Sequence, residues 1–147
     1  MKILIIYGTT GGNTEMAAEQ VADVLRKNGH TVELKRVEKS TPQDATSADL
    51  CILACPTYGH GVLQEHFVPF HAALKQADLK GKKYAVIGLG DPKYDAQYHV
   101  ESATIIEEAI KGAGGELVCP ALKISRSPVP FLDTLIQKWA EGLSKLL

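Results

Sequence analysis

The sequence predicts an α/β domain built on a doubly wound, five-stranded parallel sheet with helices on both faces. Five apolar runs of strand length recur along the 147 residues, and the segments between them place apolar residues at helical spacing. Right-handed βαβ connections then favour the strand order 2-1-3-4-5. The sequence shows no repeats, linkers or low-complexity segments, so we expect residues 1–147 to form a single domain.

The expected strands are apolar almost throughout, which is typical of parallel strands buried on both faces. They span residues 3–7, 32–37, 50–55, 84–88 and 117–124. The first helix is expected to begin near Thr14 and to present a small apolar face to the sheet. It should end at Asn28 and Gly29, which form a C-cap signal.

Prolines constrain the next two helices. Residues 38–48 leave room only for a short helix, which would start at Thr41 and Pro42. The third helical stripe contains Pro69, which lacks an N–H group and would break a helix interior. We therefore expect that helix to begin close to Pro69, with loop before it.

The last two expected helices are strongly amphipathic. One stops at Gly114 and Gly115, and the other follows Ser127 and Pro128. Trp139 lies at helical spacing beside leucines, so we interpret it as part of the core rather than as a stacking surface for a ligand.

Composition excludes several classes of partner. A formal net charge of −1 gives no basic field for nucleic acid and no polybasic segment for a membrane surface. The N-terminal apolar run is too short for a signal peptide core, so we expect a cytoplasmic protein. Cys51 and Cys55 would lie about 13 Å apart on one strand and cannot bridge each other. We expect all three cysteines, including Cys119, to be buried reduced thiols.

The loop after the first expected strand is suited to binding an anion. Residues 7–15 read Tyr-Gly-Thr-Thr-Gly-Gly-Asn-Thr-Glu and lead directly into a helix, whose first N–H groups and dipole favour a phosphate. A Walker loop would need Lys where Asn13 stands, so nucleotide triphosphate chemistry is not expected. The alternative is a plain βα turn with Asn or Thr as N-cap. The candidate phosphate-binding residues are Thr9, Thr10, Gly11, Gly12, Asn13 and Thr14.

Two further loops should meet this one at the carboxyl edge of the sheet. One follows the third strand and the other follows the fourth, and each carries a tyrosine that can stack on a flat heterocycle. The alternative is that the tyrosines merely cover the end of the sheet. The candidate ring-binding residues are Pro56, Thr57, Tyr58, Gly59, His60, Leu89, Gly90, Asp91 and Tyr94.

Together these loops make the chain resemble the flavodoxins in their short-chain form. Thr9, Gly12 and Thr14 match the family's phosphate-loop pattern, with Gly11 where that pattern has its middle Thr. Residues 57–59 match its threonine, aromatic and glycine motif, and Gly90, Asp91 and Tyr94 match its second ring-binding loop.

This resemblance implies that FMN is the cofactor. It implies a monomeric one-electron carrier that cycles between quinone, semiquinone and hydroquinone, with no catalytic side chain and no metal. Its partners would be a reductase and an electron acceptor. The Gly59 carbonyl would turn toward the flavin N5, Tyr94 would cover the outer ring face and Tyr58 the inner one, with Tyr98 as the rival of Tyr94. Flavodoxins are typically acidic around the flavin, whereas this chain places His60 and Lys93 there.

Two other functions share this type of sheet. One is an FMN enzyme, such as a quinone reductase or a flavodoxin-like activator of ribonucleotide reductase, for which the chain lacks the extra loops of a substrate pocket. The other is a phosphotransfer or phosphatase module. That reading is disfavoured because Gly61, not Arg, follows Cys55 by six positions, and because the first strand lacks a terminal acidic pair.

Overall fold

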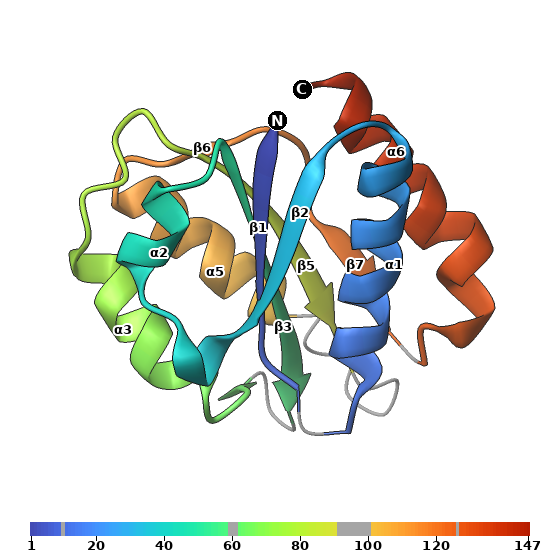
Figure 1. The fold of residues 1–147 in the computed structure, drawn as a ribbon. Helices are drawn as coiled ribbons and strands as arrows, with labels where there is room; N and C mark the ends of the chain where they lie inside the picture. Colours follow the sequence, from blue (N-terminus) through green and yellow to red (C-terminus); the bar gives the residue numbers. More distant parts are fainter. Residues whose placement is uncertain (10, 59–61, 91–100, 126) are drawn as a thin grey trace.

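The computed structural model describes residues 1–9, 11–58, 62–90, 101–125 and 127–147, and its centre is a parallel sheet (Figure 1). The strand order is β2-β1-β3-β5-β6, with β7 also paired to β5. This arrangement confirms the doubly wound fold and the predicted order 2-1-3-4-5. The parallel strands are β1 (Lys2–Tyr7), β2 (Thr31–Arg36), β3 (Leu50–Tyr58), β5 (Lys83–Leu89), β6 (Glu116–Leu117) and β7 (Leu122–Ile124).

The fifth position of the sheet differs from the prediction, which had one strand over residues 117–124. Two short pieces, β6 and β7, pair with opposite ends of β5. Between them stands Pro120, which has no N–H group to donate to a ladder. Its carbonyl oxygen accepts a hydrogen bond from the Trp139 indole N–H at 3.0 Å.

A short antiparallel strand, β4 (Val62–Leu63), was not predicted. It pairs with the end of β3, so that Thr57 lies opposite Leu63. Two residues are too few to show an alternating pattern, so the sequence carried no signal for it.

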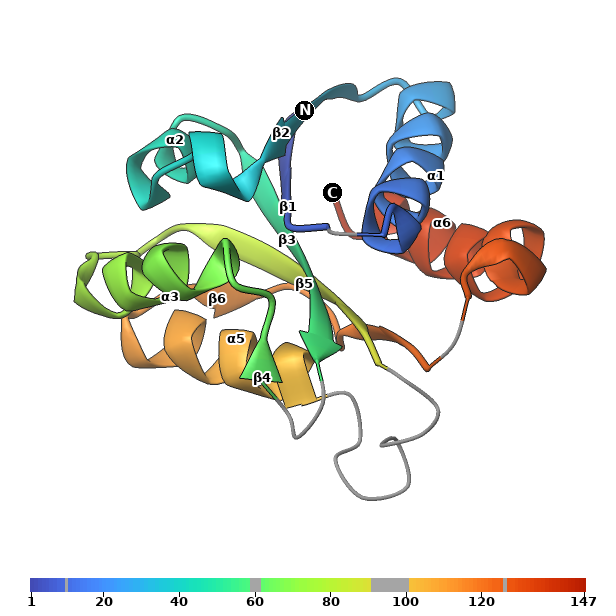
Figure 2. The same cartoon turned by 90° about the horizontal axis from the view of Figure 1, so that it is seen from below.

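One face of the sheet is covered by α1 (Asn13–Lys27) and by the C-terminal segment, as Figure 2 shows. That segment consists of a 3-10 turn, η2 (Val129–Phe131), a π-helical turn, η3 (Leu132–Ile136), and α6 (Gln137–Lys145). The carbonyl of Leu132 accepts a hydrogen bond from the Gln20 side chain of α1 at 3.1 Å. Trp139 is half-buried and packs against this core, as predicted.

The other face is covered by α2 (Pro42–Thr46), α3 (Phe67–Gln76) and α5 (Glu101–Gly112), and η1 (Val37–Lys39) precedes α2. The short α2 begins where predicted, and the Thr41 N–H donates to the Asp44 carboxylate at 2.8 Å. The residues on this face form a second apolar core.

Helix α3 begins close to Pro69, as predicted, but the expectation of loop before Pro69 was wrong for Phe67 and Val68, which are helical. Pro69 is the third helical residue, where an N–H group has no partner within the helix and a proline costs little. The helix start is held by Gln64, whose Oε1 accepts from the N–H groups of His66 (3.0 Å) and Phe67 (3.1 Å).

All three cysteines are free thiols. Cys51 and Cys55 are buried as predicted, and burial raises the pKa of Cys55 to about 12. Cys119 is only half-buried, so the prediction was wrong for that residue. Among the described residues, no helix is long and apolar enough to cross a bilayer.

Candidate cofactor-binding site

Three loops leave the sheet at one edge because the strands that precede them are parallel neighbours. Tyr7 at the end of β1 lies beside Ala54 of β3, and Pro56 of β3 lies beside Leu89 at the end of β5. In Figure 1 these carboxyl ends lie at the lower edge, and both chain termini lie at the opposite one. The predicted phosphate and ring loops therefore start from a common edge of the sheet.

The first loop begins at Gly8, where the chain passes close to the start of α3. The Gly8 N–H donates to Ala54 O at 3.0 Å, which continues the pairing of β1 with β3. A Cβ atom at this position would lie 2.7 Å from Gln64 Oε1 and 2.9 Å from a ring carbon of Phe67. Only glycine fits there without displacing the residues that hold α3.

The loop then turns into α1 through Thr9 and Gly12. Thr9 Oγ1 accepts from the Gly12 N–H at 2.9 Å, and this leaves the Thr9 hydroxyl proton available to donate. Gly12 is the N-cap of α1 and has φ 91°, a left-handed conformation that favours glycine. These contacts shape the loop between β1 and α1.

Thr14, the second residue of α1, provides the strongest sign of a ligand site. Its side chain is only 1% exposed, and its hydroxyl has no hydrogen-bond partner within the described part of the chain. An unpaired buried hydroxyl costs about 1–3 kcal/mol, so such groups are uncommon unless something binds them. The neighbouring N–H groups of the first helical turn also lack intrahelical acceptors. This set of neutral donors fits a phosphate group.

The other phosphate candidates differ in their surroundings. Gly11 and Asn13 are exposed at the start of α1, and a Cβ atom added to Gly11 would meet nothing within 4 Å. Thr10 lies outside the described residues.

Thr57, at the end of β3, has a structural role that its motif did not reveal. Its buried hydroxyl accepts from the Ser102 N–H at 3.0 Å and donates to Ser102 Oγ at 2.7 Å. Ser102 Oγ in turn donates to Cys55 O at 2.9 Å. The end of β3 is thereby tied to the first turn of α5, and the Thr57 hydroxyl is already engaged.

The structure describes some of the remaining ring-binding candidates. Pro56 and Leu89 are buried, and the Gly90 N–H donates to Ile124 O at 2.7 Å, which fixes the start of the second ring-binding loop. Tyr58 is the last residue of β3. Gly59, His60, Asp91 and Tyr94 lie outside the described residues, as do Lys93 and Tyr98.

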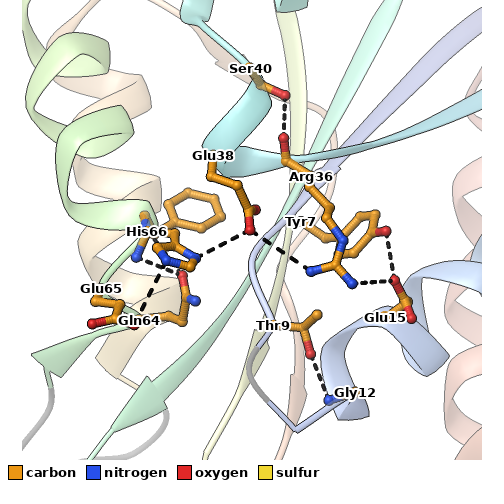
Figure 3. Close-up of polar contacts among 11 residues, drawn as sticks. Tyr7, Thr9, Gly12, Glu15, Arg36, Glu38, Ser40, Gln64, Glu65 and His66 are labelled. Carbon is orange, nitrogen blue, oxygen red and sulfur yellow. Dashed lines mark hydrogen bonds and ion pairs between the residues drawn. The ribbon is translucent and has the colours of Figure 1, made fainter.

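A polar cluster beside the phosphate loop was missed from the sequence (Figure 3). The Glu15 carboxylate accepts from the Tyr7 hydroxyl at 2.7 Å, and Arg36 Nη2 lies 3.4 Å from the same oxygen. Burial first, and then the hydrogen bond to Glu15, raises the pKa of Tyr7 to about 12. Arg36 stands at the end of β2, and only the pairing of β2 with β1 brings it to Glu15. Spacing along the sequence could not show this contact.

The strand order and the helices on both faces define a doubly wound α/β protein with a glycine- and threonine-rich loop between β1 and α1. Comparison with known proteins agrees: the flavodoxin family model matches residues 5–139. The flavodoxin of Maridesulfovibrio salexigens is 37% identical over 97% of each chain.

Solved structures give the same result. Oxidised flavodoxin 2 from Bacillus cereus has a TM-score of 0.92 at 34% identity and covers 100% of both chains. A flavodoxin from Fusobacterium nucleatum, solved bound to flavin mononucleotide, has a TM-score of 0.81 over 98% of this chain and 97% of its own. At 16% identity the latter likeness shows the fold alone.

The chain belongs to the flavodoxin family. The resemblance read from its three loops is thus confirmed, and with it the class of FMN-dependent electron carriers. The enzymatic alternatives on the same fold are not favoured.

Proposed function

We propose that the loop from Thr9 to Thr14 holds the phosphate of one noncovalently bound FMN. The single observation that carries this assignment is the buried hydroxyl of Thr14, which has no hydrogen-bond partner in the part of the chain that the structure describes. Thr9, Thr10 and Asn13 add side-chain donors, and Gly11 and Gly12 let the backbone approach the phosphate. A dianion bound by neutral donors and a helix N-terminus needs no lysine.

The flavin ring is proposed to lie against the two loops that follow β3 and β5. Tyr94 covers its outer face and Tyr58 its inner face, while Asp91 and the backbone of Leu89 and Gly90 meet its polar edge. Pro56, Thr57, Gly59 and His60 form the other side. Because the Thr57 hydroxyl is bonded to Ser102, we assign Thr57 to the shape of this loop and to backbone contacts.

When bound, FMN supplies reversible one-electron transfer. The side chains bind and orient the cofactor and exclude water, and none turns over a substrate, so we propose a carrier and not an enzyme. We further propose a single-domain monomer in the cytoplasm that exchanges electrons with a reductase and an acceptor protein.

The charge around the flavin is proposed to tune its reduction potential. His60 and Lys93 replace the acidic surroundings that are typical of flavodoxins, and a cation favours addition of negative charge to the ring. One charge at roughly 8 Å, after screening, is worth about 1 kcal/mol, or about 40 mV for one electron. A potential for His60→Asp that equals the parent's at low salt, both above and below the pH range in which a histidine titrates, overturns this assignment.

Calorimetry with FMN and riboflavin tests the phosphate assignment. Several hydrogen bonds to a charged acceptor, each worth about 1.5–3 kcal/mol, should make FMN bind far more tightly than riboflavin. Equal affinities would show that the loop does not recognise phosphate. The carrier assignment is tested separately, since an enzyme of this fold would oxidise NAD(P)H without an added reductase.

The stacking assignment needs its own pair of variants. Tyr94→Ala should weaken FMN binding and make the fully reduced flavin easier to form, because an electron-rich ring opposes added negative charge. Tyr98→Ala is the matched control. If Tyr98→Ala gives both effects and Tyr94→Ala neither, Tyr98 is the covering residue.

A further inference from the structure

Glu15 occupies the third position of α1, from which a glutamate often reaches back to the N–H group of the N-cap residue. In this chain that N–H group, on Gly12, donates to Thr9 Oγ1 instead. The Glu15 carboxylate accepts from the Tyr7 hydroxyl at 2.7 Å and pairs with Arg36 at 3.4 Å. Figure 3 shows it turned away from Gly12 and toward the end of β2.

The direction of this carboxylate matters because the first turn of α1 is where the phosphate is proposed to bind. The open N–H groups and the positive end of the helix dipole attract any nearby anion, including a glutamate of the same turn. A carboxylate on these donors would compete with the phosphate and repel its charge. Contacts that hold Glu15 elsewhere would therefore favour phosphate binding at this turn.

We propose that Tyr7 and Arg36 are positioning residues of the phosphate site, which hold the Glu15 carboxylate away from the N-terminus of α1. The inference rests on the proposed function, because it assigns the residues that keep the FMN phosphate site open. Neither residue needs to touch the cofactor.

Tyr7 is suited to this role because it is 8% exposed and presents its hydroxyl to Glu15 from a strand. A short O–H···O⁻ bond is directional and stronger than a bond between neutral groups. The side chains of Arg36 and Glu15 are 42% and 32% exposed, so their ion pair alone contributes little. The two contacts act on the same carboxylate oxygen.

Arg36 is itself held in place. Its guanidinium carbon lies 5.8 Å from the centre of the Tyr7 ring, and Nη1 lies 3.8 Å from Glu38 Oε2. Glu38 also pairs with His66, whose Nδ1 is 3.3 Å from the same oxygen. These contacts keep the guanidinium beside Glu15 without directing it at the phosphate loop.

The test compares FMN and riboflavin binding in two backgrounds. In the parent background, Tyr7→Phe combined with Arg36→Met should lower FMN affinity about tenfold, and riboflavin affinity should not change. In the Glu15→Ala background the same pair should leave FMN affinity unchanged, because the competing carboxylate is gone. Lys35→Met is the matched control, since it removes a positive charge from the adjacent position of β2 that pairs with Asp44 at 3.2 Å.

Other results would overturn the proposal. An equal loss of FMN affinity in both backgrounds means that Arg36 attracts the phosphate directly, and an equal loss with Lys35→Met means that net charge alone is responsible. Unchanged FMN affinity in the parent background also refutes it. If the double variant fails to fold, Tyr7→Phe alone decides, because it keeps the ring. A parent chain that does not bind FMN overturns the proposed function instead.

Discussion

Thr14 and Thr57 both carry a buried hydroxyl at the carboxyl edge of the sheet, but among the described residues only the Thr57 hydroxyl has hydrogen-bond partners. Thr57 exchanges hydrogen bonds with Ser102, at 2.7 and 3.0 Å. Thr14 has no partner within the described residues, although its side chain is the more deeply buried of the two, at 1% exposed against 7%. Both belong to motifs that the sequence assigned to cofactor binding. The comparison separates the hydroxyl that we propose to bind the FMN phosphate from one that ties β3 to α5.

The largest expected effect is the loss of FMN affinity when the Thr14 hydroxyl is removed. Thr14→Val should lower FMN affinity about 10- to 100-fold, because a hydrogen bond to a charged acceptor is worth about 1.5–3 kcal/mol. The free energy of unfolding of the apoprotein should not fall, since the lost hydroxyl has no hydrogen-bond partner among the described residues. Calorimetry and urea denaturation measure the two quantities, and Thr14→Ser is the control that keeps the hydroxyl. If Thr14→Val destabilises the apoprotein and leaves FMN affinity normal, Thr14 has the structural role and not the binding role.

Removing the Thr57 hydroxyl should instead lower the stability of the apoprotein. Thr57→Val leaves the buried Ser102 N–H group without its acceptor, so the free energy of unfolding of the apoprotein should fall by about 1–3 kcal/mol. Ser102→Ala should cost a similar amount, and the double variant less than the sum, because both changes remove the hydrogen bond between the two hydroxyls. Urea denaturation of the three variants measures this. An additive result would mean that the two side chains contribute independently.

The two glycines of the phosphate loop, Gly11 and Gly12, should also differ in their roles, with smaller effects. A Cβ atom meets nothing within 4 Å at either Gly11 or Gly12, but only Gly12 has a positive φ, 91°. Gly12→Thr should therefore lower the free energy of unfolding by about 1–2 kcal/mol. Gly11→Thr restores the hydroxyl of the family pattern and should raise FMN affinity a few-fold. If both substitutions lower the free energy of unfolding equally, the positive φ of Gly12 is not the cause of its loss of stability.

Tyr7 extends the comparison to a third hydroxyl, whose ionisation changes the stability of the protein only at high pH. Burial and the bond to Glu15 raise the pKa of Tyr7 to about 12 from an ordinary value near 10. The folded state thus favours the protonated phenol, which adds stability in full below pH 10 and loses it as pH rises to 12. The free energy of unfolding of Tyr7→Phe should therefore fall less steeply over this range than that of the parent. Identical slopes would show that Tyr7 ionises as freely in the folded chain as in the unfolded one.

Much of the fold could be predicted because it follows from local patterns. Apolar runs marked every strand position of the parallel sheet, and Thr41 and Pro42 marked the short α2. The errors came from prolines whose effect depends on context. Pro69 was taken to exclude the residues before it from the helix, but it stands in the first turn, where it is harmless. Pro120 was predicted to lie within one continuous strand, but it separates β6 from β7.

The site was predictable to a different degree. The phosphate loop is continuous in sequence, so its hydroxyls and glycines could be named together. The partners that distinguish them are distant along the chain: Ser102 is 45 residues from Thr57, and Arg36 is 21 residues from Glu15. Such contacts depend on strand pairing and on the packing of α5, which no local pattern contains.

The interruption at Pro120 also affects how the molecule meets its neighbours. A long outer strand offers a row of unpaired backbone groups on which another chain can add a strand and start to aggregate. Here the outer strand is divided into pieces of two and three residues, and Trp139 occupies the Pro120 carbonyl between them. The opposite outer strand, β2, carries Glu33, Lys35 and Arg36, whose charges oppose the addition of another strand. Both edges of this sheet thus discourage edge-to-edge polymerisation, as suits a protein that must leave one partner to reach the next.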